Sequence, residues 1–293
     1  MTGVEVFEGQ RSRMFGLAYR MLGSAAEAED VVQDAFLRWH RADLDAIDTP
    51  AAWLTKVVTN LCLSRLSSAR MRRESYVGPW LPEPVRTGDG ALGPLETVEQ
   101  RELVSLGVLV VLERLTAAER AVFVLREAFG YQHREIAGVL DVDEVRSRQL
   151  YARARRHVAE ARRRFPADRE RHAEIVRRFF AAAVEGDVAG LTELLAEDVV
   201  SWSDGGGKAT AARRPIVGRD KVLRYLGGFR QRPEFAQVDS EFAEVNGQLA
   251  VLLRWGGALA AVFVPEVDGD RVTALRSIIN PDKLHAVANL RSP

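Results

Sequence analysis

Four side chains near the middle of the sequence have the types and spacing of a surface that reads DNA. Arg146, Gln149, Arg153 and Arg156 recur at intervals of three and four residues, so on a helix they share one side. Arginine and glutamine pair with guanine and adenine edges in a major groove, and further arginines bind phosphates. The spacing fits a basic, solvated helix at the end of a bundle as well, so it leaves two interpretations open.

The residues around this basic stripe predict a helix-turn-helix. Ile136, Ala137 and Leu140 form the buried side of a first helix, and a tight turn at Asp141 leads into a second helix over residues 144–158. Three apolar residues give the second helix a packed side opposite the stripe: Leu150, Ala154 and Val158. The stripe is therefore expected to face solvent.

A second candidate surface is acidic and lies near the N-terminus. The Ser24–Glu27 capping-box pattern predicts a helix start, and apolar residues recur behind it at helical spacing as far as Trp39. The opposite side carries Glu27, Asp30 and Asp34. Taken alone, an ordinary solvated helix face would explain this pattern.

A third candidate surface is basic. Thr49 and Pro50 have the types of an N-cap and a first helical residue, so a helix is expected to begin here. Lys56 and Asn60 point away from its apolar side, and the Arg65–Arg73 cluster lies at its end. Cations also suit a helix C-terminus, so the cluster alone is weak evidence for a nucleic-acid site.

Prolines and glycines interrupt the helical pattern over residues 74–94, which we interpret as a linker. Trp80 and Leu81 are unusual there, because such side chains need a surface to pack against. The Thr116–Glu119 capping box belongs to a helical segment over residues 95–165. Two helices are then expected over 169–195 and strands after Glu197, with Asn246-Gly247 among the hairpin signals.

Composition narrows the classes of protein. Hydrophobic residues make up 47% and charged residues 28% of the 293 residues, which is typical of a folded protein. The net charge is zero, but arginines gather in Arg65–Arg73 and Arg146–Arg164 and acids in Glu27–Asp34, so a nucleic-acid partner is not excluded. We expect neither a membrane span nor a secretory signal. A single cysteine, Cys62, excludes an internal disulfide and fits a reducing cytoplasm.

Together these motifs resemble the sigma-70 family of bacterial RNA polymerase sigma factors, in its small extracytoplasmic-function group. Residues 28–39 are similar to the polymerase-binding helix of region two, residues 50–73 to the helix that melts and reads the −10 element, and residues 115–156 to region four, which reads −35. This chain departs from the family at Asp141, where glycine is common, and at Ser147, where a buried aliphatic residue is usual.

The C-terminal part resembles the SnoaL-like cone, and three segments match the sigma factors that carry this domain: WLPEP at 80–84, DGGGK at 204–208 and NPDKL at 280–284. In that subgroup the extra domain is understood to regulate the sigma factor from within. The implied fold class is multidomain: two all-α helical sigma domains, the second with a helix-turn-helix, followed by an α+β SnoaL-like cone. The expected boundaries are 1–73 for region two, 74–94 for the linker, 95–165 for region four and 168–288 for the regulatory cone.

The resemblance also implies site residues. Binding to core polymerase is expected of Glu29, Asp30, Gln33, Asp34 and Phe36. Contacts to −10 DNA are expected of Lys56, Asn60, Arg65, Arg70, Arg72 and Arg73, and contacts to −35 DNA of Gln132, His133, Arg146, Arg148, Gln149, Arg153, Arg155 and Arg156. Regulatory contacts between domains are expected of Trp80, Leu81, Pro82, Glu83, Pro84, Asp204, Gly205, Gly206, Gly207, Lys208, Asn280, Pro281, Asp282, Lys283 and Leu284.

The implied function is a transcription initiation factor that binds the clamp helices of the polymerase β′ subunit and promoter DNA, double-stranded and melted. We expect no enzyme activity, cofactor, metal or membrane contact. Two alternatives stay open: a one-component regulator whose cone binds a small ligand, and a cone isomerase or cyclase fused to a DNA-binding module. For catalysis the cone offers few groups, namely His172, His285, Tyr225 and Asp204, and three glycines after Asp204 predict an exposed loop.

Overall fold

The computed structural model describes the chain except residues 1, 88–91, 93–97, 163–168, 231–237 and 289–293, and only the backbone at 68–74, 98–99, 160–162 and 229–230. The chain divides into two compact units, one of residues 1–75 with 87–162 and one of residues 76–86 with 163–293. Residues 76–86 of the expected linker thus fold with the C-terminal unit. The expected boundaries at 94–95, 165 and 168 lie outside the described residues. Among described helices, none is both long and apolar enough to cross a bilayer.

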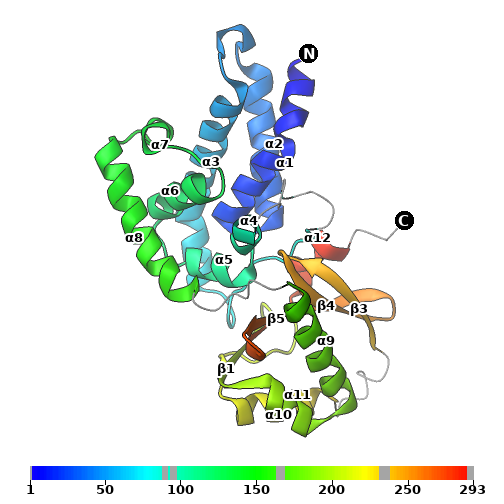
Figure 1. Cartoon of the computed structure of the whole chain (residues 1–293). Coiled ribbons are helices and arrows are strands. Elements are labelled where there is room, and N and C mark those ends of the chain that lie inside the picture. The colour runs from blue at the N-terminus through cyan, green and yellow to red at the C-terminus, as the bar shows by residue number, and fades with distance from the viewer. Residues whose placement is uncertain (1, 88–91, 93–97, 163–168, 231–237, 289–293) are drawn as a thin grey trace. The chain divides into compact units, whose positions relative to one another are not determined.

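The first unit is helical throughout its described residues (Figure 1). Its N-terminal part packs α1 (Gly3–Leu22), α2 (Ala25–Arg41) and α3 (Pro50–Glu74) together, with the short 3-10 turn η1 (Leu44–Ala46) before α3. The predicted helix start at Ser24 is confirmed, because its hydroxyl accepts a hydrogen bond from the Glu27 amide at 3.1 Å. Its second part consists of α4 (Val98–Glu102), α5 (Leu106–Leu112), α6 (Ala117–Glu127), α7 (His133–Leu140) and α8 (Glu144–Arg162).

Helices α7 and α8 form the predicted helix-turn-helix. The turn between them depends on Asp141, whose φ of 56° and ψ of 47° place it in the left-handed region. This conformation explains why glycine is common at the position in related proteins. Ile136 and Ala137 are buried as expected. Leu140 was expected to be buried but is only half-buried, because Val139, at 7% exposure, takes the inner position of the last turn.

The second unit is a helix-covered sheet. Helices α9 (Arg169–Glu185) and α10 (Val188–Leu194) precede β1 (Leu195–Asp204), β2 (Ile216–Val217) and α11 (Arg219–Arg230). Four strands follow, β3 (Val238–Val245), β4 (Gln248–Trp255), β5 (Ala258–Asp268) and β6 (Arg271–Ile278), and the chain ends in the 3-10 turn η3 (Pro281–Lys283) and α12 (His285–Ala288). The described strands lie in the order β2-β1-β6-β5-β4-β3, with β1 parallel to β6 and the other pairs antiparallel.

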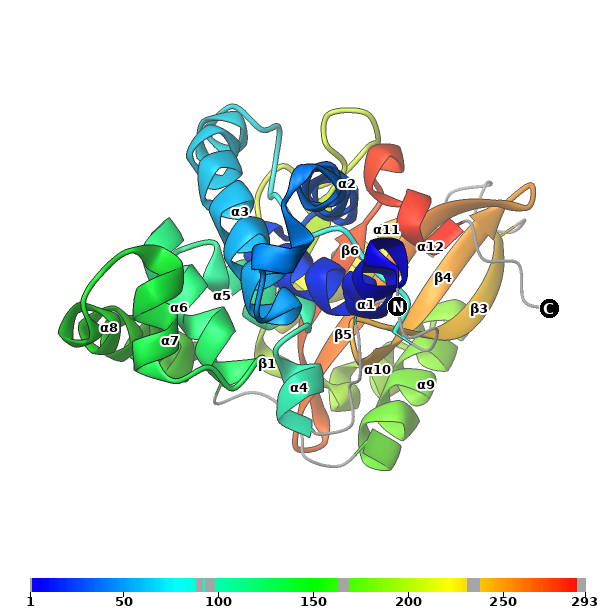
Figure 2. The same cartoon turned by 90° about the horizontal axis from the view of Figure 1, so that it is seen from above.

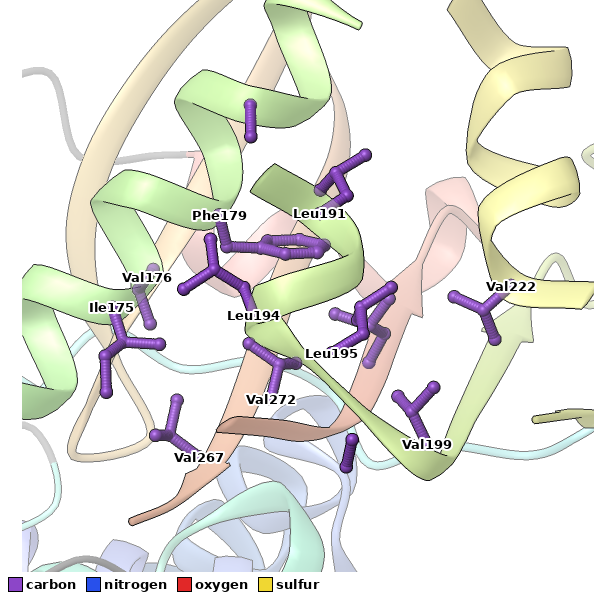
Figure 3. Packing of buried hydrophobic residues seen from close by; sticks show 13 residues of the cluster. Ile175, Val176, Phe179, Leu191, Leu194, Leu195, Val199, Val222, Val267 and Val272 are labelled. Carbon is purple, nitrogen blue, oxygen red and sulfur yellow. The ribbon is translucent and has the colours of Figure 1, made fainter. Parts of the chain in front are cut away.

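The core of this unit lies between one face of the sheet and its helices. Helix α9 contacts β4, β5 and β6, and α11 contacts β1 (Figures 1 and 2). In Figure 3 Phe179 of α9 lies beside Leu191 and Leu194 of α10, and Val199 of β1 and Val272 of β6 belong to the same buried cluster. Burial of these apolar side chains is what holds the helices on the sheet.

Three turns of this sheet have left-handed backbone, at Asn246-Gly247, at Gly256-Gly257 and at Gly269 between β5 and β6 (φ 57°). The predicted hairpin between β3 and β4 is confirmed, with positive φ at Asn246 (52°) and Gly247 (73°). A second turn, Gly256-Gly257, joins β4 to β5 in the same way and was not predicted. Strand β2 and helix α11 were also missed, because β2 has only two residues and α11 follows directly after it.

The left-handed turn at Asp141 yields a stability prediction. Asp141→Gly should raise the thermal unfolding temperature of the chain, because a Cβ in this conformation costs about 1 kcal/mol relative to glycine. Asp141→Ala should lower it, because alanine keeps the Cβ and lacks the short polar side chain that makes aspartate tolerable in this region. The difference is measured by thermal unfolding of the two variants beside the wild-type chain. An alanine variant as stable as the glycine variant would contradict the backbone account.

Candidate functional sites

The basic stripe lies on the solvent side of α8. Leu150, Ala154 and Val158 are at most 4% exposed and form the packed side that the sequence predicts. On the other side six candidate DNA-binding side chains are exposed: Arg146, Arg148, Gln149, Arg153, Arg155 and Arg156. Arg148 also bonds to Glu144 one turn earlier, at 2.5 Å. The helix thus presents an exposed arginine- and glutamine-rich face, as a major-groove helix does.

Gln132 and His133 lie at the start of α7. The Gln132 side chain is exposed and accepts a hydrogen bond from Arg126 at 3.1 Å. The ring of His133 is half-buried, and its Nδ1 lies 3.0 Å from the hydroxyl of Ser147 inside the motif. Partial burial, with Arg126 and Arg148 nearby, lowers the pKa of His133 below its ordinary value. This environment therefore favours the neutral form of the ring.

The acidic candidate surface is an exposed patch on α2. We call Glu29, Asp30, Gln33, Asp34 and Phe36 the acidic patch. Its carboxylates are well hydrated, with 56%, 64% and 44% of the Glu29, Asp30 and Asp34 side chains exposed. Phe36 packs edge to face on Phe7, with ring centres 5.0 Å apart. A shallow hollow of about 330 Å³ lies beside Phe36 and Gln33.

Arg65 connects the acidic patch to the basic candidate surface. Its guanidinium donates to Asp34 at 2.7 Å and to Asp30 at 3.3 Å, and these bonds raise the pKa of Arg65 against the effect of burial. One residue expected at −10 DNA is therefore bound to two residues expected at the polymerase. No pattern within one helix could indicate this contact, because 31 and 35 residues separate the partners.

The rest of the basic surface lies along α3. Lys56 and Asn60 are exposed, as the helical pattern predicts. The side chains of Arg70, Arg72 and Arg73 lie outside the described residues, so their arrangement stays a prediction.

The linker strip is the segment Trp80–Pro84, and it lies against the sheet of the C-terminal unit. Both polar groups of the Leu81 backbone are bonded there: its amide donates to Asp204 Oδ2 at 2.8 Å, and its carbonyl accepts from Lys283 Nζ at 2.6 Å. The Leu81 side chain is 1% exposed, and Pro82 and Pro84 are buried. Trp80 and Leu81 thus have the partner surface that the sequence requires.

Asp204 is the centre of this attachment. Its carboxylate also accepts from Lys283 at 2.7 Å and from the Tyr76 hydroxyl at 2.5 Å, and its side chain is 0% exposed. Burial and the bond to Asp204 raise the pKa of Tyr76. We call Tyr76, Asp204, Asn280 and Lys283 the Asp204 cluster. Tyr76 was missed in the sequence, although it lies just before the strip.

The NPDKL segment at residues 280–284 completes the Asp204 cluster. Asn280 donates from Nδ2 to the Tyr76 hydroxyl at 2.8 Å, and its Oδ1 accepts from the Asp282 amide at 3.1 Å. The ammonium of Lys283 lies 4.3 Å from the ring centre of Trp80 and 4.8 Å from that of Tyr76, as in a cation–π contact. Leu284 is buried, whereas Pro281 is exposed.

The expectation of an exposed glycine loop is wrong at its first two residues. Asp204 and Gly205 are buried, because Asp204 ends strand β1 and the strip covers it, and only Gly207 and Lys208 are exposed. Gly206 has φ 58°, and a Cβ there would lie 2.2 Å from Nδ2 of Asn280. At this position glycine permits close approach of the loop to the cluster.

A second attachment lies four residues further along the chain. The Val85 amide donates to Asn246 Oδ1 at 3.0 Å, and the Asn246 amide donates to the Val85 carbonyl at 2.9 Å. Next to it Arg86 bonds to Glu241 of β3 at 2.8 Å. The sequence had indicated Asn246 as a turn residue, but not that its side chain holds the linker.

The residues considered for catalysis do not converge on one site. Both oxygens of Asp204 are bonded to the strip and its neighbours. Tyr225 shares a hydrogen bond with Ser203 at 2.9 Å. His172 is buried beside the Pro265 backbone, and burial lowers its pKa. In the described residues, the carboxylate most suited to act as a base is occupied in holding the linker.

Comparison with known proteins gives matches that cover up to 98% of the chain. Models of sigma-70 region 2, sigma-70 region 4 and a SnoaL-like domain match residues 6–72, 105–158 and 176–278. The ECF RNA polymerase sigma factor SigJ of Mycobacterium tuberculosis is 41% identical over 96% of this chain and 92% of its own length. A probable ECF RNA polymerase sigma factor, SigI of the same species, is 33% identical over 95% and 93%. The crystal structure of SigJ matches 98% of this chain and all of its own, with a TM-score of 0.79 and 39% identity.

The buried pair in the Asp204 cluster yields a prediction about the linker strip. Asp204→Ala should speed hydrogen exchange at the Leu81 amide by about a hundredfold or more, because removing one partner of a buried ion pair costs about 3–5 kcal/mol. Lys283→Met, which keeps most of the side-chain volume, should act in the same direction. Exchange is followed by mass spectrometry on the full chain.

Lys208→Ala serves as the matched control, because its ion pair with Asp282 is more than half exposed on both sides. This variant should leave protection of the strip unchanged. Equal exchange in the Asp204 and Lys208 variants would show that the buried pair does not hold the strip.

Proposed function

Since the chain belongs to the extracytoplasmic-function sigma factors of RNA polymerase, we propose that it recruits core polymerase to specific promoters and that its own C-terminal unit modulates this step. The observation that carries the proposal is the presence, in one helical unit, of the exposed acidic patch on α2 and the exposed reading face of α8. A simple repressor with a small-molecule domain needs only the DNA-reading face of α8 and has no need of the acidic patch.

The acidic patch is the proposed docking site for the clamp helices of the polymerase β′ subunit. Exposed carboxylates beside an aromatic side chain suit a basic, partly apolar partner surface. In the free chain, Arg65 occupies Asp30 and Asp34. Docking therefore exchanges an internal ion pair for an intermolecular one, which makes Arg65 available to DNA phosphates at the −10 element.

Recognition of the promoter is divided between two surfaces. The exposed face of α8 enters the major groove at −35, with Gln132 and His133 beside the backbone. Lys56, Asn60 and the arginines at the end of α3 contact the −10 element as it melts. Arginine and lysine bind the phosphates, and Asn60 supplies a donor and an acceptor for an exposed base.

Regulation acts through the linker strip. The strip belongs to the segment between the two sigma regions. Asp204 and Lys283 hold it on the sheet, and Asn246 holds Val85 directly after it. Covalent attachment gives this contact a high effective concentration. The C-terminal unit therefore limits the arrangements that regions two and four can adopt. Release of the strip permits arrangements that the attached strip prevents.

The first test is initiation from a cognate promoter by core enzyme and the purified chain. Asp30→Lys with Asp34→Lys should weaken binding to core polymerase and lower transcription, because reversed charges repel a basic partner. The fold should persist, since 64% of the Asp30 side chain and 44% of the Asp34 side chain are exposed. Core affinity is measured by titration, with circular dichroism as the check of folding.

Arg65→Ala is the matched comparison, because it removes the internal competitor of the acidic patch. This variant should bind core polymerase as well as the wild-type chain or up to about fivefold more tightly, the range that an exposed ion pair of 0–1 kcal/mol allows. Unchanged core affinity in the well-folded double variant would contradict the docking site. No promoter-specific initiation by the wild-type chain would contradict the proposed function itself.

The second test concerns the C-terminal unit. Removing residues from Asn280 onward should raise transcription, because the strip loses Asn280 and Lys283, and Trp80→Ala should act in the same direction. Deleting residues 169–293 should instead impair transcription, because a fully freed linker no longer keeps regions two and four in a productive arrangement. All three variants are compared on one promoter after a check of folding. Wild-type activity in every one would mean that the unit has no regulatory role.

A further inference from the structure

Ser147 is a polar residue in an apolar interior. It lies on the packed side of α8 with 0% exposure, where its neighbours along the helix are Leu150 and Ala154. A buried hydroxyl is costly unless it forms a hydrogen bond. The hydroxyl of Ser147 has such a partner in Nδ1 of His133, at 3.0 Å, on the other helix of the motif.

The ring of His133 is held on two sides. Besides the bond to Ser147, it packs edge to face on Tyr151 of α8, with ring centres 5.5 Å apart. Tyr151 is in turn bonded to Glu127 of α6. The charged groups around the ring are Arg126 and Glu127 of α6 and Glu144 and Arg148 of α8. Nδ1 is the ring nitrogen that faces the buried hydroxyl, and Nε2 lies on the opposite edge of the half-buried ring.

We propose that Ser147 is a positioning residue for promoter binding: its hydroxyl donates to Nδ1 of His133, which places the proton of the neutral ring on Nε2, where it donates to a phosphate oxygen of the −35 DNA backbone. This inference rests on the proposed function. The first helix of a helix-turn-helix crosses the DNA backbone, and His133 is its first residue. A phosphate oxygen accepts hydrogen bonds and donates none.

The chemistry needs a hydroxyl at this position. A neutral imidazole has one N–H, and the partner of the other nitrogen decides which nitrogen carries it. A serine hydroxyl can donate to Nδ1, whereas an aliphatic side chain can neither donate nor accept. The low pKa of His133 keeps the ring in the neutral state, in which this choice matters.

The test uses the complex of core polymerase with the full chain on a promoter fragment at pH 8. Ser147→Ala and Ser147→Val should each weaken promoter binding about fivefold, the effect of losing one hydrogen bond of about 1 kcal/mol. The loss should be equal on promoters with altered −35 bases, because a phosphate contact carries no base preference. In a His133→Ala background the same changes should have no further effect.

Measurements at acidic pH distinguish a positioning role of Ser147 from a role in packing alone. Below the pKa of His133 both ring nitrogens carry protons whatever residue stands at 147, so the deficit of Ser147→Ala should shrink as the pH falls from 8 through the pKa of His133. A role in packing alone would leave the deficit in the His133→Ala background and at every pH, and would overturn the proposal. A changed base preference would also overturn it.

These outcomes are distinct from failure of the proposed function. A wild-type chain that does not bind promoters with core polymerase overturns the proposed function and this inference together. A wild-type chain that binds, beside a Ser147→Val variant that binds equally well and is equally stable, overturns only the role of Ser147.

Discussion

A carboxylate that leaves water must be paired, and Asp204 is a fully buried carboxylate with three donors around it. Two of the three, the Tyr76 hydroxyl and the Leu81 amide, come from the segment between the sigma regions. The third, the Lys283 ammonium, comes from the end of the chain and also bonds to the Leu81 carbonyl. The linker, the end of β1 and the last turn of the chain therefore depend on one charge. This explains why the three matching segments occur together: each supplies groups that the others leave unsatisfied.

The sequence of the strip lowers the cost of this attachment. Pro82 and Pro84 have no amide to satisfy and have a fixed φ, so an extended strip loses less conformational entropy when it binds. The amides that are bonded to the sheet belong to Leu81 and Val85, on either side of the prolines. The hydrogen bonds at Leu81 and Val85 supply the favourable enthalpy, and Pro82 and Pro84 between them supply the rigidity. A flexible glycine-rich linker of the same length would have to be ordered at much greater cost.

Residue spacing within single helices predicted most of the helical architecture. Contacts between residues far apart in the sequence could not be predicted in this way. The helix-turn-helix and the exposed stripe on α8 follow from spacing, since Leu150, Ala154 and Val158 can share only one side of a helix. The resemblance of residues 80–84, 204–208 and 280–284 to known segments pointed to one regulatory contact. No local pattern could show that Asp204 is buried, because its partners lie 79 and 128 residues away. Glycines beside an acid suggest a solvated turn until the covering strip is known. The bonds of Arg65 to Asp30 and Asp34 could not be predicted for the same reason, because 35 and 31 residues separate the partners.

The two kinds of ion pair in the chain suit different tasks. Arg65 is bound to Asp30 and Asp34 at the surface, where water competes and such pairs contribute about 0–1 kcal/mol, so a partner protein can exchange them readily. Asp204 and Lys283 are 0% and 7% exposed, where loss of one partner leaves a charge without solvent. Release of the strip therefore requires that Asp204 and Lys283 become hydrated or find new partners together. Exchange of a weak surface ion pair suits reversible docking on polymerase. A buried ion pair suits a restraint on the linker that persists until both charges are hydrated or find new partners.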